Sequence, residues 1–222
     1  MNEITVIKCE TVGKGKIRVG FDTGLSCLLY RGEMKSLDIC ESGTIDAITY
    51  QRMIEEVLCK RARRRAMHLL EQMDRTEAQL RDKLKAGEYP KECIDDAVMY
   101  VAKYHYIDDE RYAANYVRNA QSKKSRRRIQ QDLMKKGVAK ETIEEALEEE
   151  YVSDEEDQIR ELLTKKGFDY KTADEKEFRR TYSFLLRRGF KANDILRVMK
   201  YEEPYYLSLI HISEPTRQAE IS

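Results

Sequence analysis

The chain has 222 residues, of which 41% are hydrophobic and 37% charged, and its 41 basic and 41 acidic residues cancel to a formal net charge of zero. Hydrophobic residues recur at regular intervals, which excludes a disordered chain, and this length suffices for one or two domains. No hydrophobic run approaches the roughly 18 residues of a membrane span, and the first ten residues lack a signal-peptide pattern.

The cysteine content predicts free thiols in a reducing cytoplasm. The five cysteines are an odd number, contain no CxxC motif, and have no histidine at metal-ligand spacing. We therefore expect neither a disulfide framework nor a zinc site, and we expect a cytoplasmic location without membrane contact.

The first 30 residues differ from the rest because their hydrophobic residues alternate with polar ones between short turns. Gly13–Gly15 and Asp22–Gly24 separate three such runs, which predicts a three-stranded β meander with residues 31–43 as a connection. So small a sheet is marginal alone and should pack on the helices that follow. The Gly-Lys-Gly-Lys stretch is a hairpin turn rather than a phosphate loop, since no helix follows it directly.

A long helix is predicted from about Asp46 to Met73, and from there one hydrophobic pattern occurs three times with identical internal spacing. Each copy predicts a helix hairpin, preceded by a first helix at about 59–72, 109–121 or 154–166. Asp74 with Glu77 suggests a capping box, and Pro90 begins a helix. The copies are Leu80, Leu84, Ile94, Ala97 and Val98; Ile129, Leu133, Ile143, Ala146 and Leu147; and Thr181, Leu185, Ile195, Val198 and Met199. Their turns contain Gly87, Gly137 and Gly189.

The predicted fold class is mainly α, with three tandem three-helix repeats in an elongated array after the small N-terminal meander. The predicted divisions are residues 1–43 for the meander and connection, 44–107 for the long helix and first repeat, 108–153 for the second, 154–203 for the third, and 204–222 for an unstructured tail. The sequence after Tyr205 loses the helical pattern and resembles a translated cloning adaptor, so we expect a non-native tail.

The sequence contains no recognisable catalytic or cofactor motif. His68 and His105 have no nucleophile motif beside them, and a lone histidine is usually a surface or packing residue. The cluster Asp108–Glu110 could ligate a hard cation, but its place before a helix favours capping. We therefore predict a protein that is not an enzyme and that has no cofactor and no metal.

Two basic runs, Lys60–Arg65 and Lys123–Arg128, contrast with the acidic run Glu141–Asp157. They are either interaction surfaces or solvated helix faces, and the second run could instead pair with the acidic run. Aromatic residues are not interleaved with them, which favours weak, non-specific phosphate contact over base stacking. The candidate protein- or DNA-binding residues are Arg63, Arg64, Lys123, Lys124, Arg126 and Arg127.

The residues Tyr106–Ala113, followed by Arg127–Ile129, Leu133 and Lys136–Val138, resemble the hallmark of the RecX family. In that family a motif of the type LDD-x-R-[FY]-A opens the second repeat, and Leu185–Phe190 resembles the end of the third-repeat hairpin. The resemblance covers roughly residues 45–203. Ser125 departs from it, because the family usually has glycine there. The match at Arg128 beside Ile129 implies that Arg128 has a structural role.

The resemblance implies a non-catalytic, cytoplasmic and monomeric regulator of DNA repair, recombination and the SOS response. Such a protein binds the RecA recombinase and its filament on single-stranded DNA, and inhibits ATPase and strand-exchange activity. Two alternatives stay open, a helical-repeat DNA-binding regulator and a scaffold, each acting without RecA. Helix-turn-helix-like hairpins favour the DNA-binding regulator, but acidic residues within 94–98 and 143–147 would repel phosphates.

Overall fold

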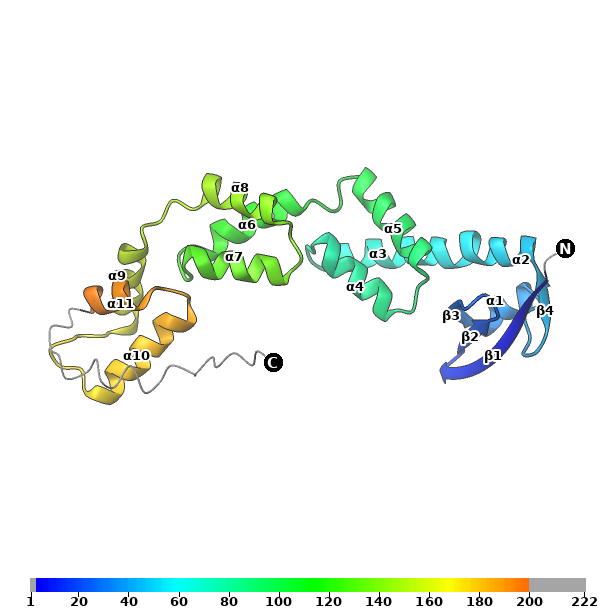
Figure 1. The fold of residues 1–222 in the computed structure, drawn as a ribbon, viewed down its shortest axis with the longest axis horizontal. Helices are drawn as coiled ribbons and strands as arrows, with labels where there is room; N and C mark the ends of the chain where they lie inside the picture. Colours follow the sequence, from blue (N-terminus) through cyan, green and yellow to red (C-terminus); the bar gives the residue numbers. More distant parts are fainter. Residues whose placement is uncertain (1–2, 200–222) are drawn as a thin grey trace, which may run out of the picture. The chain divides into compact units, whose positions relative to one another are not determined.

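The computed structural model describes residues 3–199, which form a small sheet followed by helices (Figure 1). The predicted tail, residues 204–222, lies outside the described residues. The elements of the N-terminal part are β1 (Glu3–Gly13), β2 (Lys16–Phe21), β3 (Ser26–Tyr30), α1 (Arg31–Ser36), β4 (Thr44–Asp46), α2 (Ala47–Arg52) and the π-helical segment η1 (Met53–Cys59).

The N-terminal sheet is antiparallel and, within the described residues, has four strands in the order β3-β2-β1-β4. The three predicted strands form, and β4 adds a fourth by pairing Ile45 with Ile4 of β1. The prediction of a three-stranded meander was therefore one strand short. The predicted connection is also wrong in part, because residues 31–36 form α1, where the Glu33 side chain accepts a hydrogen bond from the Tyr30 backbone N–H.

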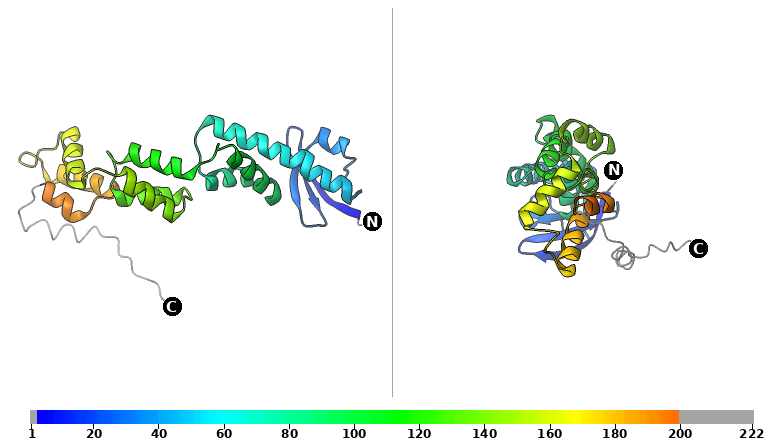
Figure 2. Two further views of the ribbon diagram at one scale, coloured as in Figure 1. Left: turned by 90° about the horizontal axis from the view of Figure 1, so that it is seen from above. Right: turned by 90° about the vertical axis from the view of Figure 1, so that its left-hand side faces the viewer.

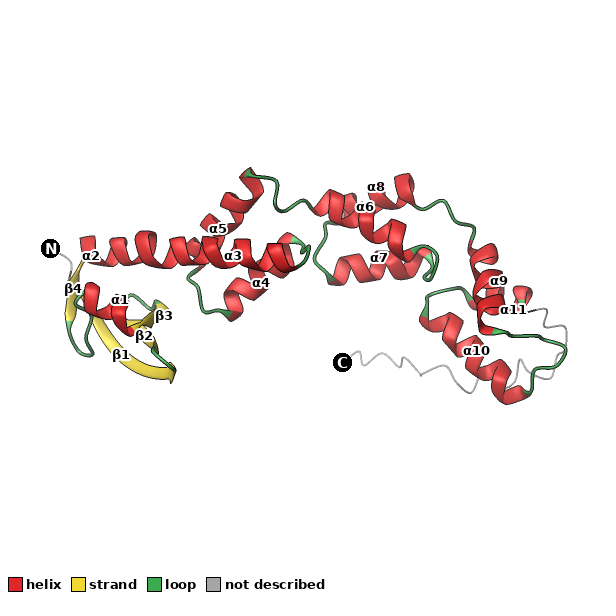
Figure 3. Ribbon diagram, turned by 180° about the vertical axis from the view of Figure 1, so that it is seen from behind, coloured by secondary structure: helices red, strands yellow, loops and turns green. Residues whose placement is uncertain are grey.

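The sheet shares one hydrophobic core with the first helices, as its small size led us to expect. Val6 and Val19 of the sheet and Met53 of η1 are all fully buried in this core. Figure 3 shows the strands gathered at the α2 end of a long helix. That helix consists of α2, η1 and α3 (Lys60–Gln72), and it confirms the predicted helix from about Asp46 to Met73.

The remaining helices follow the predicted three-helix repeats. The first repeat combines α3 with α4 and α5, and both lie against α3 in the views of Figures 1 and 2. The helices are α4 (Glu77–Ala86) and α5 (Lys91–Lys103); α6 (Asp109–Ala120), α7 (Arg126–Lys135) and α8 (Lys140–Glu150); and α9 (Glu155–Lys166), α10 (Glu175–Arg187) and α11 (Ala192–Val198).

The repeated hydrophobic pattern is the interior of these repeats. Leu133, Ile143 and Leu147 expose 2% of their surface or less, and Leu84 and Leu185 are fully buried at positions equivalent to Leu133. Val198 is partly buried against the third-repeat core, while the other members of the pattern are buried. The predicted pattern is therefore confirmed as the core of each hairpin.

The helix starts follow local capping chemistry. Pro90 is the N-cap of α5, as predicted, but the capping box of α4 is Thr76 with Gln79 rather than Asp74 with Glu77. The Thr76 hydroxyl accepts a hydrogen bond from the Gln79 backbone N–H at 3.2 Å. Threonine is well suited to this position because its oxygen satisfies an amide that has no partner within the helix.

The described residues divide into two compact units that do not coincide with repeat boundaries. The first contains the sheet, the first repeat and most of the second, up to residue 118 and again over 130–150. The second contains residues 119–129 with the described residues from Tyr151 onward. Helix α7 thus contributes its first turn to one unit and the rest to the other.

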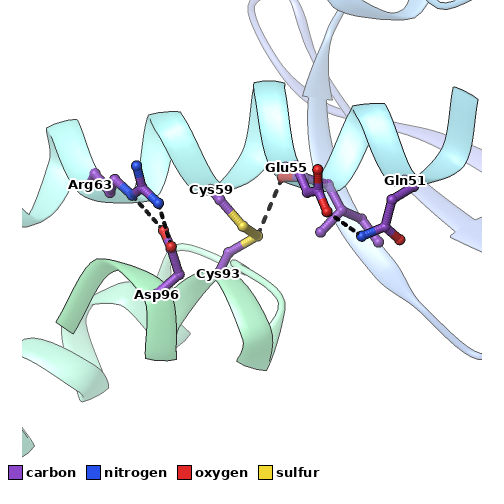
Figure 4. Close-up of a disulfide and its surroundings, with 7 residues drawn as sticks. Gln51, Glu55, Cys59, Arg63, Cys93 and Asp96 are labelled. Atoms are coloured by element: carbon purple, nitrogen blue, oxygen red, sulfur yellow. Dashed lines mark hydrogen bonds and ion pairs between the residues drawn. A yellow bond between two sulfur atoms is a disulfide. The ribbon is translucent and has the colours of Figure 1, made fainter. Parts of the chain in front are cut away.

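Two cysteines are paired, contrary to the prediction of free thiols. Cys59 at the end of η1 and Cys93 in α5 form a disulfide with a Cα–Cα distance of 4.4 Å (Figure 4). Cys9, Cys27 and Cys40 are free. Neither partner belongs to a recognisable motif, and the packing of α5 against η1 brings them together. Burial raises the pKa of the Cys27 thiol to about 12.

The turn between α4 and α5 differs from the other two hairpins. Gly137 and Gly189 have left-handed backbones with φ of 82° and 90°, but the equivalent residue of the first hairpin is Glu88, with φ of 56°. A non-glycine residue in this left-handed conformation lowers the stability of the fold by about 1–2 kcal/mol. The Glu88 carboxylate accepts two hydrogen bonds of 2.6 Å from Arg18 of β2, which lower its pKa and tie the sheet to the hairpin.

Candidate interaction site

The first and second repeats meet at the caps of their helices. The Thr76 hydroxyl at the start of α4 donates a 2.5 Å hydrogen bond to the Lys136 carbonyl at the end of α7. The Asp109 carboxylate accepts one of 3.0 Å from the Glu77 backbone N–H, so the second repeat also caps α4. Burial raises the pKa of Asp109. A substituent at Gly137 would lie 2.2 Å from the Ala78 side chain, so this contact requires glycine.

The third repeat meets the start of α7 in the same way. Ser125 precedes α7, its hydroxyl accepts a 3.3 Å hydrogen bond from the Arg128 N–H, and its own N–H donates to the Arg188 carbonyl at 3.0 Å. A substituent at Gly189 would lie 2.6 Å from the Ser125 hydroxyl oxygen. Ser125 therefore acts as the helix cap that Thr76 provides in the first repeat.

The first basic run lies on α3, where Arg63 is committed to the fold. Its guanidinium binds both carboxylate oxygens of Asp96 on α5, with a 2.6 Å bond from Nε (Figure 4). It also lies 5.3 Å from the Tyr100 ring centre. The hydrogen bond from Arg63 to Asp96 raises the pKa of the arginine. Arg63 consequently holds α3 to α5. Only the exposed part of its side chain is left to contact a partner, as the sequence predicted for this residue.

Arg64 is exposed and lines a groove of about 350 Å³. The groove runs along α3 and reaches Tyr100 on α5. It is lined by Lys60, Arg63, Arg64, Met67, His68, Glu71 and Tyr100. Arg63 and Arg64, which the sequence predicted as binding residues, therefore line the same groove, and Arg64 is the exposed one.

The second basic run surrounds the start of α7. Lys123, Arg126 and Arg127 are exposed, whereas Lys124 is half-buried and already makes contacts within the protein. Arg128 is likewise half-buried and engaged, which agrees with its predicted structural role. The structure thus leaves three of the four predicted cations of this run open to solvent.

The acidic run contacts this region, but partly through the backbone. The Glu155 carboxylate accepts a 3.1 Å hydrogen bond from the Arg126 backbone N–H and caps α7. Elsewhere the Glu150 carboxylate binds Arg118 of α6 through two bonds of 2.6 Å, which lower its pKa. Internal pairing of the acidic run is therefore present, with Arg118 as a partner that the sequence did not suggest.

The other titratable candidates lie at a helix start and in a turn. Asp108 accepts a 2.8 Å hydrogen bond from the Arg111 N–H, so the cluster before α6 caps helices as predicted. His105 has a left-handed backbone with φ of 56° in the turn after α5. Among residues 3–199, no three His, Cys, Asp or Glu side chains group closely enough to hold a metal ion.

Sequence reasoning missed an exposed aromatic cluster beside the first basic run. Tyr100 and Tyr104 lie on one face at the end of α5 with ring centres 5.1 Å apart, and Tyr106 follows at 6.3 Å from Tyr104. Aromatic residues are not interleaved with the basic runs in the sequence, but folding places Tyr100 beside Arg63 of the first run. The spacing of Tyr100 and Tyr104 is visible in the sequence, but the pairing of α3 with α5 is not.

Helix hairpins with a leading helix, joined to their neighbours through helix caps, define a tandem three-helix-repeat protein. Three family models match this chain in order: the first three-helix domain of RecX at residues 62–99, the second at 108–147 and the third at 154–199. The chain belongs to the RecX family.

Known relatives agree with this assignment. The Regulatory protein RecX of Caldanaerobacter subterraneus subsp. tengcongensis is 34% identical over 165 residues, covering 73% of this chain and 81% of the relative. That of Clostridium acetobutylicum is 29% identical over 209 residues, covering 90% and 95%. A crystal structure of regulatory protein RecX superimposes with a TM-score of 0.54 at 22% identity, covering 90% of this chain and all of that one, and it supports the fold. None of the helices within residues 3–199 is long and apolar enough to span a membrane.

Proposed function

We propose that this chain is a non-catalytic, cytoplasmic regulator that binds the RecA recombinase and its filament on single-stranded DNA. It restrains the filament's ATPase and strand-exchange activities as a monomer, and so regulates DNA repair. The observation that supports this function is the ordered match of all three repeats to the RecX three-helix domains. Repeat proteins present long binding surfaces, which suit a filament as partner.

The expected result of adding the protein to RecA, single-stranded DNA and ATP is a concentration-dependent fall in ATP hydrolysis. The protein alone, with DNA and ATP, should hydrolyse nothing. A pull-down with and without preformed filament should show retention that depends on RecA. Unchanged ATP hydrolysis at a molar excess of the protein would contradict the proposal.

A DNA-binding regulator that acts without RecA is less well supported by the hairpins. The second helix of a helix-turn-helix reader enters the major groove and needs cations or neutral polar groups there. In α5, Asp95 and Asp96 are occupied by Arg81 and Arg63. In α8, Glu144 and Glu145 are exposed. The exposed carboxylates of α8 oppose the approach of DNA phosphates, whereas those of α5 are already paired with arginines.

Replacing the exposed cations Lys123, Arg126 and Arg127 together by glutamine is expected to weaken inhibition of RecA ATPase. Each phosphate contact on a single strand contributes about 0.7 to the salt slope of binding, so the slope should become shallower by up to about 2. The measurement is ATPase inhibition across a salt series, with a circular-dichroism melt to establish that the fold is intact.

A matched control removes the same charge elsewhere. Lys14, Lys35 and Lys91 are exposed and lie outside both basic runs, and their replacement by glutamine should leave inhibition and its salt slope unchanged. Equal inhibition by the variant and the unmodified protein at every salt concentration would contradict a binding role. A lower melting temperature with unchanged inhibition would instead indicate pairing within the protein.

A further inference from the structure

We propose that Tyr100, Tyr104 and Tyr106 form a base-stacking site for single-stranded nucleic acid, flanked by Lys60, Arg64 and Lys103. The site deepens the proposed function and rests on it for its biological setting, because it would let the protein hold the DNA strand directly.

The three rings are exposed although they lie next to one another. Tyr100 exposes 37% of its surface, Tyr104 52% and Tyr106 48%. Their centres are separated by 5.1 Å and 6.3 Å, and their planes are inclined by 60° and 43°. In the T-shaped pair of Tyr100 and Tyr104 the edge of one ring meets the face of the other, and the exposed fractions show that about half of Tyr104 and of Tyr106 remains available to a flat ligand. Exposed aromatic clusters of this kind mark binding sites.

The stacking site is held in place at Tyr100, and it continues through Tyr104 to Tyr106. The Arg63 guanidinium, fixed by Asp96, lies 5.3 Å from the centre of the Tyr100 ring and holds this tyrosine against α3. Tyr104 follows Tyr100 one helical turn later and is the C-cap of α5, where the chain turns toward Tyr106. Preorganised rings lose little conformational freedom when they bind, which favours stacking.

The cations around the rings favour an anionic ligand. Lys60 and Arg64 line the same groove as Tyr100, and Lys103 places its ammonium 5.9 Å from the Tyr104 ring centre. Two carboxylates are nearby: Asp96 is paired with Arg63, and Glu71, which also lines the groove, lies 3.8 Å from the His68 ring. Single-stranded nucleic acid combines phosphates with unpaired bases, and such strands bind where a cationic groove adjoins aromatic rings.

The test measures binding of a fluorescent oligothymidylate of about 16 nucleotides to the full chain without RecA. Tyr104→Ala should weaken binding by about 5- to 100-fold, since stacking of one base contributes about 1–3 kcal/mol. Tyr104→Phe should bind normally, and Tyr104→Leu should bind as weakly as the alanine variant. Tyr170→Ala is the matched control, because Tyr170 is 45% exposed with Lys171 5.9 Å from its ring centre. It should bind normally.

A second measurement separates bases from phosphates. An abasic oligonucleotide of the same length should bind more weakly than oligothymidylate to the unmodified protein, and equally weakly to Tyr104→Ala. Because the chain contains no tryptophan, Tyr104→Trp adds a single reporter whose fluorescence should be quenched by oligothymidylate, whereas Tyr170→Trp should not respond. Circular-dichroism melts of all variants establish that each is folded.

The outcomes distinguish this site from the proposed function. Normal oligothymidylate binding by Tyr104→Ala, or equal binding of the abasic strand, would overturn the stacking site while leaving RecA inhibition untouched. Loss of RecA inhibition by Tyr104→Ala in a protein that binds no oligonucleotide would also overturn it, and would identify the cluster as a protein-docking surface. Oligothymidylate binding without any effect on RecA would support the site and contradict the proposed function.

Discussion

Replacing Leu133 by alanine is expected to lower the free energy of unfolding by about 2–5 kcal/mol. Leu133 is fully buried in α7, at the centre of the second hairpin, and its carbonyl accepts the 3.2 Å hydrogen bond from Val138 N–H that closes the helix end. Truncation removes buried hydrophobic surface and leaves a cavity that the surrounding helices fill only in part. Denaturant unfolding monitored by circular dichroism measures the change.

Met134 provides the control because it is the next residue of the same helix and 55% exposed. Met134→Ala should change the free energy of unfolding by no more than about 0.5 kcal/mol. Since repeats are stabilised by their neighbours, Leu133→Ala should also speed hydrogen exchange in α4, which is bonded to the end of α7 through Thr76. If Leu133→Ala lowered the free energy of unfolding as little as Met134→Ala, residue 133 would not lie in the core of the repeat.

The repeats were predictable because a one-sided hydrophobic pattern is a local property of each helix. Leu84, Leu133 and Leu185 occupy the same position in three hairpins, and the sequence alone aligns them. The fourth strand was not predictable, since Thr44–Asp46 is three residues long and is defined by its pairing with β1. The sequence likewise places Cys59 and Cys93 on different helices, and the packing of those helices decides whether they meet.

The candidate site was predictable in its charges and not in its arrangement. In the sequence, Arg63 and Arg64 are equivalent members of one basic run. In the structure, Arg63 is bound by the Asp96 carboxylate on α5, whereas Arg64 is exposed. The aromatic cluster at Tyr100 and Tyr104 adjoins that run through the same packing of α5 on α3. Both outcomes depend on contacts between helices, about which the periodicity of a single helix contains no information.

Replacing Gly137 by alanine is expected to cost about 2–5 kcal/mol of unfolding free energy, from two separate causes. The backbone of Gly137 has φ of 82°, where a side chain adds about 1–2 kcal/mol of strain. The new Cβ would also lie 2.2 Å from the Ala78 side chain, so α4 and the end of α7 must separate, at about 1–3 kcal/mol. Thermal and denaturant unfolding measure the total.

Two further variants separate these causes. Gly167 has φ of 71° with no atom within 4 Å of its added Cβ, so Gly167→Ala should show the strain alone. Ala78→Gly removes the side chain with which the new Cβ of Gly137→Ala would clash. The double variant should therefore lose at least about 1 kcal/mol less unfolding free energy than the two single variants lose in sum. Additive losses, or equal losses for Gly137→Ala and Gly167→Ala, would show that the first two repeats are not held in close contact at this glycine. Coupling between Ala78 and Gly137 would instead establish that close approach of helix caps joins one repeat to the next, as the contact of Gly189 with Ser125 does in the second unit.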